Sequence, residues 1–174
     1  MSDSLSRRSF IACSAVAAVA AGCGPATPSP WDFLTPQMAT ALAVLADQII
    51  PADDFPSASQ AGAVVYIDRQ LARHYRNHQD AYREGLEMAA HLAKSSTGHQ
   101  VEALTASEQL AWARQIEHDS PEFFNLVRQH TMEGYYGTPR HGGNRDAVSW
   151  RMLGLDEPPL HGRAQYGAQK DGAQ

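Results

Sequence analysis

Hydrophobic residues recur three or four positions apart along most of the chain, and this spacing predicts a series of amphipathic helices. The first helix begins at Thr35-Pro36, where a hydroxyl N-cap precedes a proline that suits the first turn, and it ends before Pro51. Its apolar face comprises Met38, Leu42, Leu45 and Ile49. Residues 51–62 contain two prolines among small and polar residues, so we expect a loop there.

Two more helices are predicted after this loop. The second presents an apolar face made of Val64, Ile67, Leu71 and Tyr75. The third extends over about residues 80–94, and its inward residues are Tyr82, Leu86, Ala89 and Leu92. We expect it to end in the polar, glycine-containing stretch of residues 95–100.

A fourth and a fifth helix have clear start signals. Thr105 and Glu108 have the spacing of a capping box, in which each residue satisfies a backbone N–H near the other. The apolar surface of the fourth helix comprises Leu110, Trp112, Ala113 and Ile116. Ser120-Pro121-Glu122 opens the fifth helix, and its inward residues are Phe123, Phe124, Val127 and Thr131.

No segment alternates between hydrophobic and polar residues for long, so the sequence predicts an all-α fold. We expect a small helical domain of about five helices, followed by a long irregular C-terminal segment rich in glycine and aromatic residues. Within that segment, Asn144 is expected to start a last short helix that continues through Trp150 to Leu153. A thin core and an irregular segment favour a protein that gains stability from a partner.

The N-terminus has the pattern of an export signal. Arg7 and Arg8 precede Phe10, and an uncharged, alanine-rich run follows over residues 11–22. The run is shorter than the roughly 20 apolar residues that span a bilayer. We therefore predict that residues 1–22 are a twin-arginine signal peptide, which exports proteins already folded. The alternative is an ordinary secretory signal that contains an arginine pair.

The small residues before Cys23 resemble a lipobox, in which the cysteine becomes a lipidated N-terminus; the alternative is conventional cleavage nearby. We expect residues 23–32 to form a proline-rich tether, residues 33–155 the helical domain, and residues 156–174 a flexible polar tail. Only Cys13 and Cys23 are cysteines, so the domain holds no disulfide, thiolate-ligated cluster or covalently attached haem of the Cys-x-x-Cys-His kind.

Composition disfavours several other functions. The net charge of -5, without a basic stripe, argues against nucleic acid as a partner. Asp53 and Asp54 are expected to be solvated or to cap a turn rather than to bind a metal ion. His74 and His78 stand four apart on one predicted helix face, but no third ligand accompanies them. No nucleophile motif and no Gly-x-Gly-x-x-Gly is present, so the chain has no recognisable flavin or nicotinamide fold.

The stretch "GYYGTPRHGGNRDAVSWRMLGL" from Gly134 to Leu155 allows two interpretations. It contains an acid/base cluster of His141, Arg145 and Asp146, or it forms a contact surface for another protein. The residue types enriched in such interfaces favour the second interpretation. The proposed contacts are Tyr135, Tyr136, Arg145, Trp150 and Met152. Tyr135 and Trp150 pack this chain's own core in the alternative interpretation.

This stretch resembles the C-terminal signature of the gluconate 2-dehydrogenase subunit 3 family. The matching residues are Gly134, Tyr135, Tyr136, Gly137, Pro139, Gly142, Gly143, Asn144, Trp150 and Gly154. Residues 45–71 are similar to the family's other block, in which a helix ends in Ile-Ile-Pro and Ala-Gly-Ala leads into Ile-Asp. Thr138 and His141 depart from the family's usual residues, which puts only the local hydrogen bonding in doubt.

The resemblance implies a non-catalytic small subunit of a dehydrogenase complex that oxidises gluconate, another sugar or a polyol. A large subunit of the glucose-methanol-choline oxidoreductase type would bind FAD, and a multi-haem cytochrome c subunit would carry electrons onward. The small subunit would carry the signal for the twin-arginine translocase and support maturation of the flavoprotein. It would reside in the periplasm at the inner membrane and bind no cofactor itself. The alternatives are a free-standing exported enzyme and a lipid-anchored structural protein.

Overall fold

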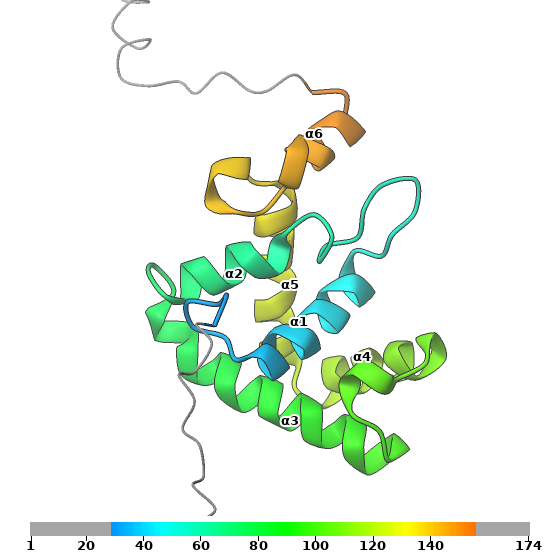
Figure 1. Ribbon diagram of the computed structural model, residues 1–174. Helices are drawn as coiled ribbons and strands as arrows, with labels where there is room; N and C mark the ends of the chain where they lie inside the picture. The colour runs from blue at the N-terminus through cyan, green and yellow to red at the C-terminus, as the bar shows by residue number, and fades with distance from the viewer. Residues whose placement is uncertain (1–28, 156–174) are drawn as a thin grey trace, which may run out of the picture.

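The computed structural model describes residues 29–155, and over that range the chain is helical without a strand (Figure 1). The helices are α1 (Pro36–Ile49), α2 (Ala63–Leu71), α3 (Gln79–Thr97), α4 (Ala106–Asp119), α5 (Pro121–Tyr136) and α6 (Val148–Met152). Short 3-10 turns occupy Arg76–His78, Val101–Ala103, Pro139–His141 and Arg145–Ala147. The predicted all-α fold is therefore confirmed. The predicted signal peptide, Cys23, most of the tether and the polar tail lie outside the described residues.

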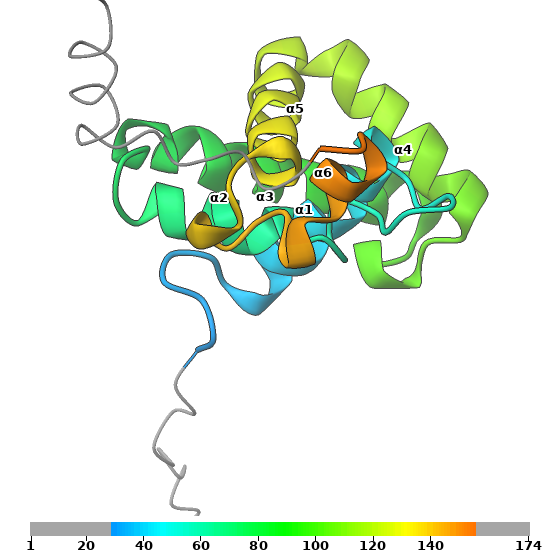
Figure 2. The same ribbon diagram turned by 90° about the horizontal axis from the view of Figure 1, so that it is seen from above.

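Helix α1 is the central element of the bundle. It contacts α2, α3, α4 and α5, and the two views agree that these helices surround it (Figures 1 and 2). The main core comprises side chains from all five helices, among them Leu42, Leu45, Ile67, Leu86, Ile116 and Val127. A second, smaller cluster joins the loop after α1 to the ends of α5 and α6; its members include Ala46, Ala58, Ala61, Tyr135 and Val148. Within the described residues, no helix combines the length and the apolar character needed to cross a membrane.

Several helix starts follow the local signals in the sequence. The Thr35 hydroxyl accepts a hydrogen bond from the backbone N–H of Met38 at 3.2 Å, and α1 ends before Pro51. The capping box at α4 forms in both directions, from the Thr105 N–H to the Glu108 carboxylate at 2.8 Å and from the Glu108 N–H to the Thr105 hydroxyl at 3.4 Å. These bonds satisfy N–H groups that a helix start otherwise leaves unpaired.

The second helix is shorter than predicted, because α2 ends at Leu71 and Tyr75 lies beyond it. The Tyr75 N–H bonds to the Gln70 carbonyl at 2.8 Å, and the Gln79 side chain bonds to the Leu71 carbonyl at 2.9 Å, which closes the helix end. The placement of His74 and His78 on one helix face is therefore wrong. His74 lies in the turn after α2, and His78 lies in the 3-10 turn before α3.

Two other expectations need correction. Leu110 is 43% exposed, because α4 packs through Trp112, Ala113 and Ile116, and the Trp112 indole N–H bonds to the Ala89 carbonyl of α3 at 2.8 Å. Helix α5 continues through Tyr136, so the irregular segment begins only at Gly137. Gly134 does not interrupt the helix, since its missing side chain lets α5 approach Tyr66 and Ala63 of α2 closely.

Candidate partner-binding surface

The C-terminal segment lies directly against the loop and helix that follow α1, and glycines permit this approach. Gly62 has a φ of +86°, and a Cβ there would lie 2.6 Å from the Gly142 carbonyl oxygen. Gly142 has a φ of +99°, and a Cβ there would lie 2.7 Å from the Arg69 guanidinium. Gly143 is in turn too close to the Gly134 carbonyl to carry a side chain. The glycines of both family-like blocks therefore bring two backbone segments into direct contact.

Hydrogen bonds fix the segment in this position. The Arg145 N–H donates to the Ala61 carbonyl at 2.8 Å, across the contact between the two blocks. Asn144 is fully buried; its amide donates to the Gly137 carbonyl at 2.8 Å and accepts from the Ser149 N–H at 2.9 Å. This one side chain thus ties the end of α5 to the start of α6. Its left-handed φ of +44° is a conformation that asparagine tolerates better than most residues.

The proposed interface residues divide between the core and the surface. Tyr135 is 1% exposed, and its hydroxyl donates to the Pro56 carbonyl at 2.9 Å. Trp150 is 8% exposed, and its indole N–H donates to the Tyr136 carbonyl at 3.1 Å. The structure therefore places Tyr135 and Trp150 in this chain's own core, as the alternative interpretation expected. Tyr136 is 39% exposed, Arg145 is exposed, and Met152 is half-buried.

Most of the exposed large hydrophobic side chains come from one part of the chain. Five large hydrophobic residues are exposed in the described part of the chain, and all but Leu110 lie between Met132 and Leu155. We call the surface formed by these four residues, Met132, Tyr136, Leu153 and Leu155, the α5/α6 surface. Figure 1 shows the end of α5 and α6 together at one end of the bundle. Exposed apolar residues that cluster in this way mark interaction surfaces.

The sequence interpretation missed three residues of this surface. Met132 lies one helical turn before Tyr136, so the two share a face of α5. The sequence interpretation did not place Met132 and Tyr136 on one face because it did not extend the fifth helix to Tyr136. Leu153 and Leu155 follow α6, where the chain no longer packs inward. Arg140, Arg145 and Arg151 of the segment are also exposed, and Arg145 lines a pocket with Pro36 of α1 and Val64 of α2.

The acid/base cluster of the other interpretation does not assemble. His141, Arg145 and Asp146 are all exposed, and within residues 29–155 no side-chain hydrogen bond or ion pair joins them. A general base needs a partner that orients it, and His141 has none among these residues. Asp53 accepts a hydrogen bond from the Phe55 N–H at 2.8 Å, as a turn-capping acid does. The described residues contain no group of three or more side chains placed to hold a metal ion.

A polar cluster that the sequence did not indicate lies between α2, α3 and α5. Tyr82 is fully buried, and its hydroxyl lies 3.0 Å from Nδ1 of His130. The ring of Tyr75 stacks on His130 with centroids 4.4 Å apart, and its hydroxyl donates to Glu133 at 2.8 Å. Burial lowers the pKa of His130 and, with Glu133 nearby, raises the pKa of Tyr82. The cluster therefore holds a neutral imidazole and a neutral phenol against each other.

Hydrogen bonds determine the charge of Glu133 in this cluster. Burial raises the pKa of its carboxyl group, but donors from Gln129, Tyr75 and Tyr66 outweigh burial, so that the pKa is lowered overall. The carboxylate is thus held in its charged form by three side chains. Every polar side chain named here has its hydrogen-bond partner within the fold, so the cluster is a stabilising network between helices.

A family model described as gluconate 2-dehydrogenase subunit 3 matches residues 36–156. The match covers both blocks that meet at the glycine contacts, together with all six helices. No curated protein and no solved structure matches the chain.

Proposed function

The chain belongs to the gluconate 2-dehydrogenase subunit 3 family, and on this premise we propose that it is the non-catalytic small subunit of an FAD-dependent dehydrogenase complex. The large subunit, of the glucose-methanol-choline oxidoreductase type, binds FAD and oxidises gluconate, another sugar or a polyol. A multi-haem cytochrome c subunit accepts the electrons. The chain described here binds the flavoprotein, stabilises it and assists its maturation and export.

The α5/α6 surface is the observation that supports this proposal most directly. It holds nearly all the exposed large hydrophobic side chains of the described residues, and the exposed Arg145 belongs to the same C-terminal segment. Tyrosine, methionine and arginine are enriched where protein surfaces bury against one another. The flavoprotein therefore contacts Tyr136, Met152 and Arg145, while Tyr135 and Trp150 support that surface from inside. A partner that binds only the folded chain also stabilises it by mass action.

Export is the second part of the proposal. Arg7, Arg8 and Phe10 form the signal that the twin-arginine translocase recognises, and this route carries folded proteins. A flavoprotein without its own signal then crosses the membrane bound to this chain. In the periplasm the complex stays at the inner membrane, where lipidation of Cys23 adds an anchor.

Co-purification tests the contact surface. We expect the double variant Tyr136→Ala/Arg145→Ala to retain about tenfold less flavoprotein than the wild-type chain, as loss of one central contact does. The matched control is Leu110→Ala, because Leu110 is as exposed as Tyr136 but lies on α4. Flavoprotein retained at wild-type stoichiometry by the double variant would contradict the proposed surface.

Localisation tests the export role separately. Replacing Arg7 and Arg8 by lysine preserves the charge and removes the twin-arginine pattern. We expect both this chain and the flavoprotein to accumulate in the cytoplasm, which cell fractionation detects. If the flavoprotein still reaches the periplasm, this chain is not its escort, whatever the result for the contact surface.

A further inference from the structure

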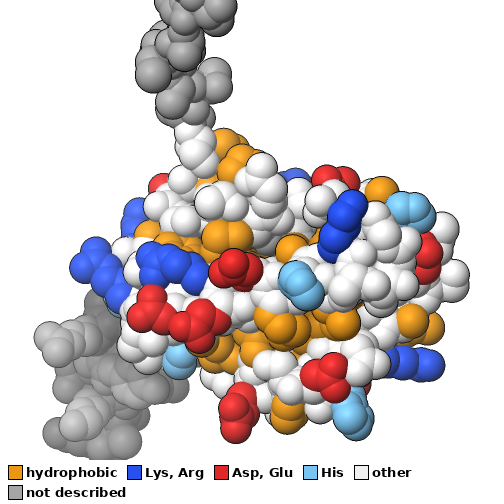
Figure 3. All heavy atoms as spheres, turned by 90° about the horizontal axis from the view of Figure 1, so that it is seen from below, with side chains coloured by type: hydrophobic (Ala, Val, Ile, Leu, Met, Phe, Trp, Pro, Cys, Tyr) orange, Lys and Arg blue, Asp and Glu red, His pale blue; other side chains and the backbone are white. Residues whose placement is uncertain are grey.

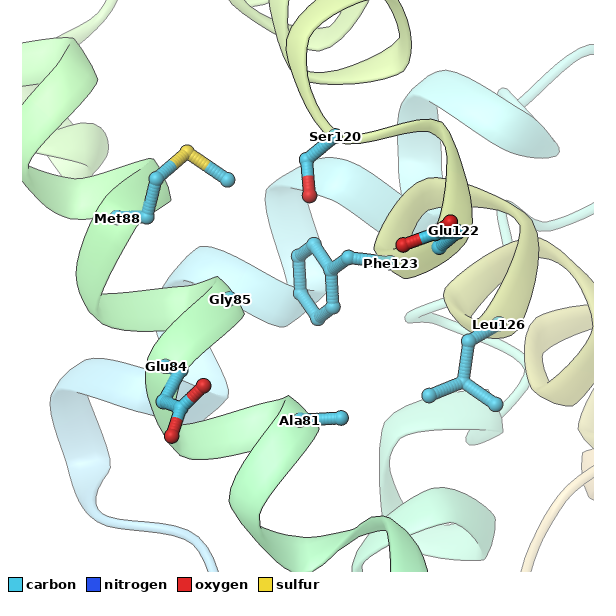
Figure 4. A pocket seen from close by; sticks show the side chains of 8 residues that line it. All are labelled: Ala81, Glu84, Gly85, Met88, Ser120, Glu122, Phe123 and Leu126. Atoms are coloured by element: carbon cyan, nitrogen blue, oxygen red, sulfur yellow. The ribbon is translucent and has the colours of Figure 1, made fainter.

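An open apolar groove lies between α3 and α5, away from the α5/α6 surface. It encloses about 440 Å³, and its walls include Ala81 and Met88 of α3 and Leu126 of α5 (Figure 4). Its floor is the ring of Phe123, which rests on Gly85. Any side chain at position 85 would overlap that ring, so the glycine allows the ring to pack on the backbone of α3.

The rim of the groove is acidic. Glu84 of α3 and Glu122 of α5 stand on opposite walls, and both are exposed. No lysine or arginine is among the described residues that line the groove. Figure 3 shows hydrophobic side chains gathered at the centre of the face that looks down in Figure 1, with acidic, basic and histidine side chains around them. The groove therefore suits an apolar segment that also carries positive charge.

The first described residues are held by Asp68 of α2 and by α3, on the side of α3 away from the groove. The buried carboxylate of Asp68 accepts hydrogen bonds from the N–H groups of Asp32, Phe33 and Leu34 at 2.8–2.9 Å. The Arg83 guanidinium of α3 lies over the Phe33 ring, 4.9 Å from its centre. Arg83 and the groove residues occupy different sides of the same two turns of α3. Phe33 therefore lies against the helix that forms one wall of the groove.

We propose that this groove binds the chain's own N-terminal leader before export. The uncharged run of residues 11–22 supplies an apolar segment of the kind that the groove accommodates, and Arg7 and Arg8 supply positive charge for Glu84 and Glu122. Opposite charges on the groove and on the leader favour this occupant. Binding covers the apolar run until the translocase takes up the leader, and it requires no flavoprotein.

The length of the intervening chain permits this contact. Residues 23–28 span up to about 20 Å when extended, at about 3.3–3.6 Å per residue. Halfway around a helix about 10–12 Å in diameter is about 16–19 Å, so a segment of this length can pass from one side of α3 to the other. The C-terminal residues 156–174 fit less well, because they begin with Asp156 and Glu157 and lack an apolar run. Charge and composition therefore both select the leader.

Disulfide trapping in the full-length chain tests the proposal, because Cys13 lies within the apolar run and the domain has no cysteine of its own. In a Cys23→Ser background, we place a cysteine in the groove with Met88→Cys. The matched control is Leu110→Cys, on an exposed apolar position of α4. Under mild oxidation, we expect the bond from position 13 to position 88 to form about tenfold faster than the bond to position 110, since binding raises the effective concentration.

Two further variants make the outcome decisive. Leu126→Cys repeats the test from the α5 wall, in case the change at Met88 disturbs folding. Glu84→Gln with Glu122→Gln should slow trapping, whereas Glu102→Gln with Glu117→Gln, two exposed acids outside the groove, should not. Equal trapping at the groove and control positions overturns the proposal, and so does a bond that forms only between two chains. Because the test uses this chain alone, its failure leaves the role as a dehydrogenase subunit untouched.

Discussion

Gly143 packs against the backbone of Gly134 so closely that a methyl group at position 143 would overlap the Gly134 carbonyl oxygen. This contact closes the C-terminal segment onto α5 and sets the position of the α5/α6 surface. The backbone of Gly143 does not require a left-handed conformation, so the space available is what requires a glycine there. The glycines of this segment therefore support the α5/α6 surface structurally.

Gly143→Ala is expected to lower the free energy of unfolding by about 2–3 kcal/mol, because the added methyl group must displace backbone rather than a flexible side chain. Urea denaturation measures the change. Gly98→Ala is the matched control: Gly98 has a φ of +79° but nothing within 4 Å, so only about 1–2 kcal/mol of backbone strain is expected there. A smaller loss at position 143 than at position 98 would show that the two segments do not meet as described.

Asn144→Asp tests the side chain that bridges the segment. The change keeps the oxygen that accepts from the Ser149 N–H and replaces the amide that donates to the Gly137 carbonyl. At neutral pH a buried carboxylate then faces a carbonyl oxygen, and we expect a loss of about 2–3 kcal/mol in the free energy of unfolding.

The pH dependence of this variant supplies its control. The new carboxyl group is harder to ionise in the folded state than in the unfolded state, so its folded pKa is raised. Stability is then lost as the pH rises and recovered as it falls, because the protonated group can donate to the Gly137 carbonyl again. The difference between wild type and variant should shrink between pH 7 and pH 4. A constant difference would mean that the donor to Gly137 is unimportant.

The sequence predicts a helix boundary correctly where neighbouring residues determine it. It does not do so where contacts with distant parts of the chain determine it. The starts of α1 and α4 depend on side chains within three residues of the cap, and both appear in the structure. The end of α2 depends on Tyr75, which leaves the helix to contact His130 and Glu133 far along the chain. The residues around Tyr75 give no indication in the sequence that its contacts are with His130 and Glu133.

In the candidate surface, the sequence likewise does not show which of two adjacent residues is buried. Tyr135 and Tyr136 are neighbours of one type, and composition cannot tell which of them faces inward. Their environments differ because α5 continues through both and turns them about 100° apart around its axis. The helix continues because Gly134 fits against α2, whereas a lone glycine near a helix end usually signals termination.

Asp68→Asn tests the anchor of the first described residues. In the wild type, the N–H groups of Phe33 and Leu34 donate to one carboxylate oxygen and the Asp32 N–H donates to the other. The variant's amide has only one acceptor oxygen, so its NH2 group faces at least one of these backbone donors. We expect a loss of about 2–3 kcal/mol in the free energy of unfolding and faster proteolysis near Trp31. Asp53→Asn, at an exposed acid with one backbone donor, should change stability by less than about 1 kcal/mol. Unchanged proteolysis would show that Asp68 does not hold this segment.

His130 should make stability depend on pH in a defined window. Burial lowers its pKa below the ordinary value of 6.5; nearby Glu133 raises it less, and His78 lowers it further. Tyr75 and Tyr82 flank the ring and stay neutral, because burial raises the pKa of each hydroxyl group. Between the folded and unfolded pKa values of His130, the unfolded chain binds a proton that the folded chain does not.

The free energy of unfolding should therefore fall as the pH is lowered from about 7.5 through 6.5, by at most about 1.4 kcal/mol per pH unit, until the folded pKa is reached. Glu133 does not produce this slope, since its pKa is lowered from 4.5 and its contribution is lost only at more acidic pH. His130→Gln should flatten the profile between pH 7.5 and 5.5, whereas His99→Gln, at an exposed histidine, should leave it unchanged. Urea titrations across this range measure both variants. If the free energy of unfolding of His130→Gln still falls over this pH range, a group other than His130 takes up the proton.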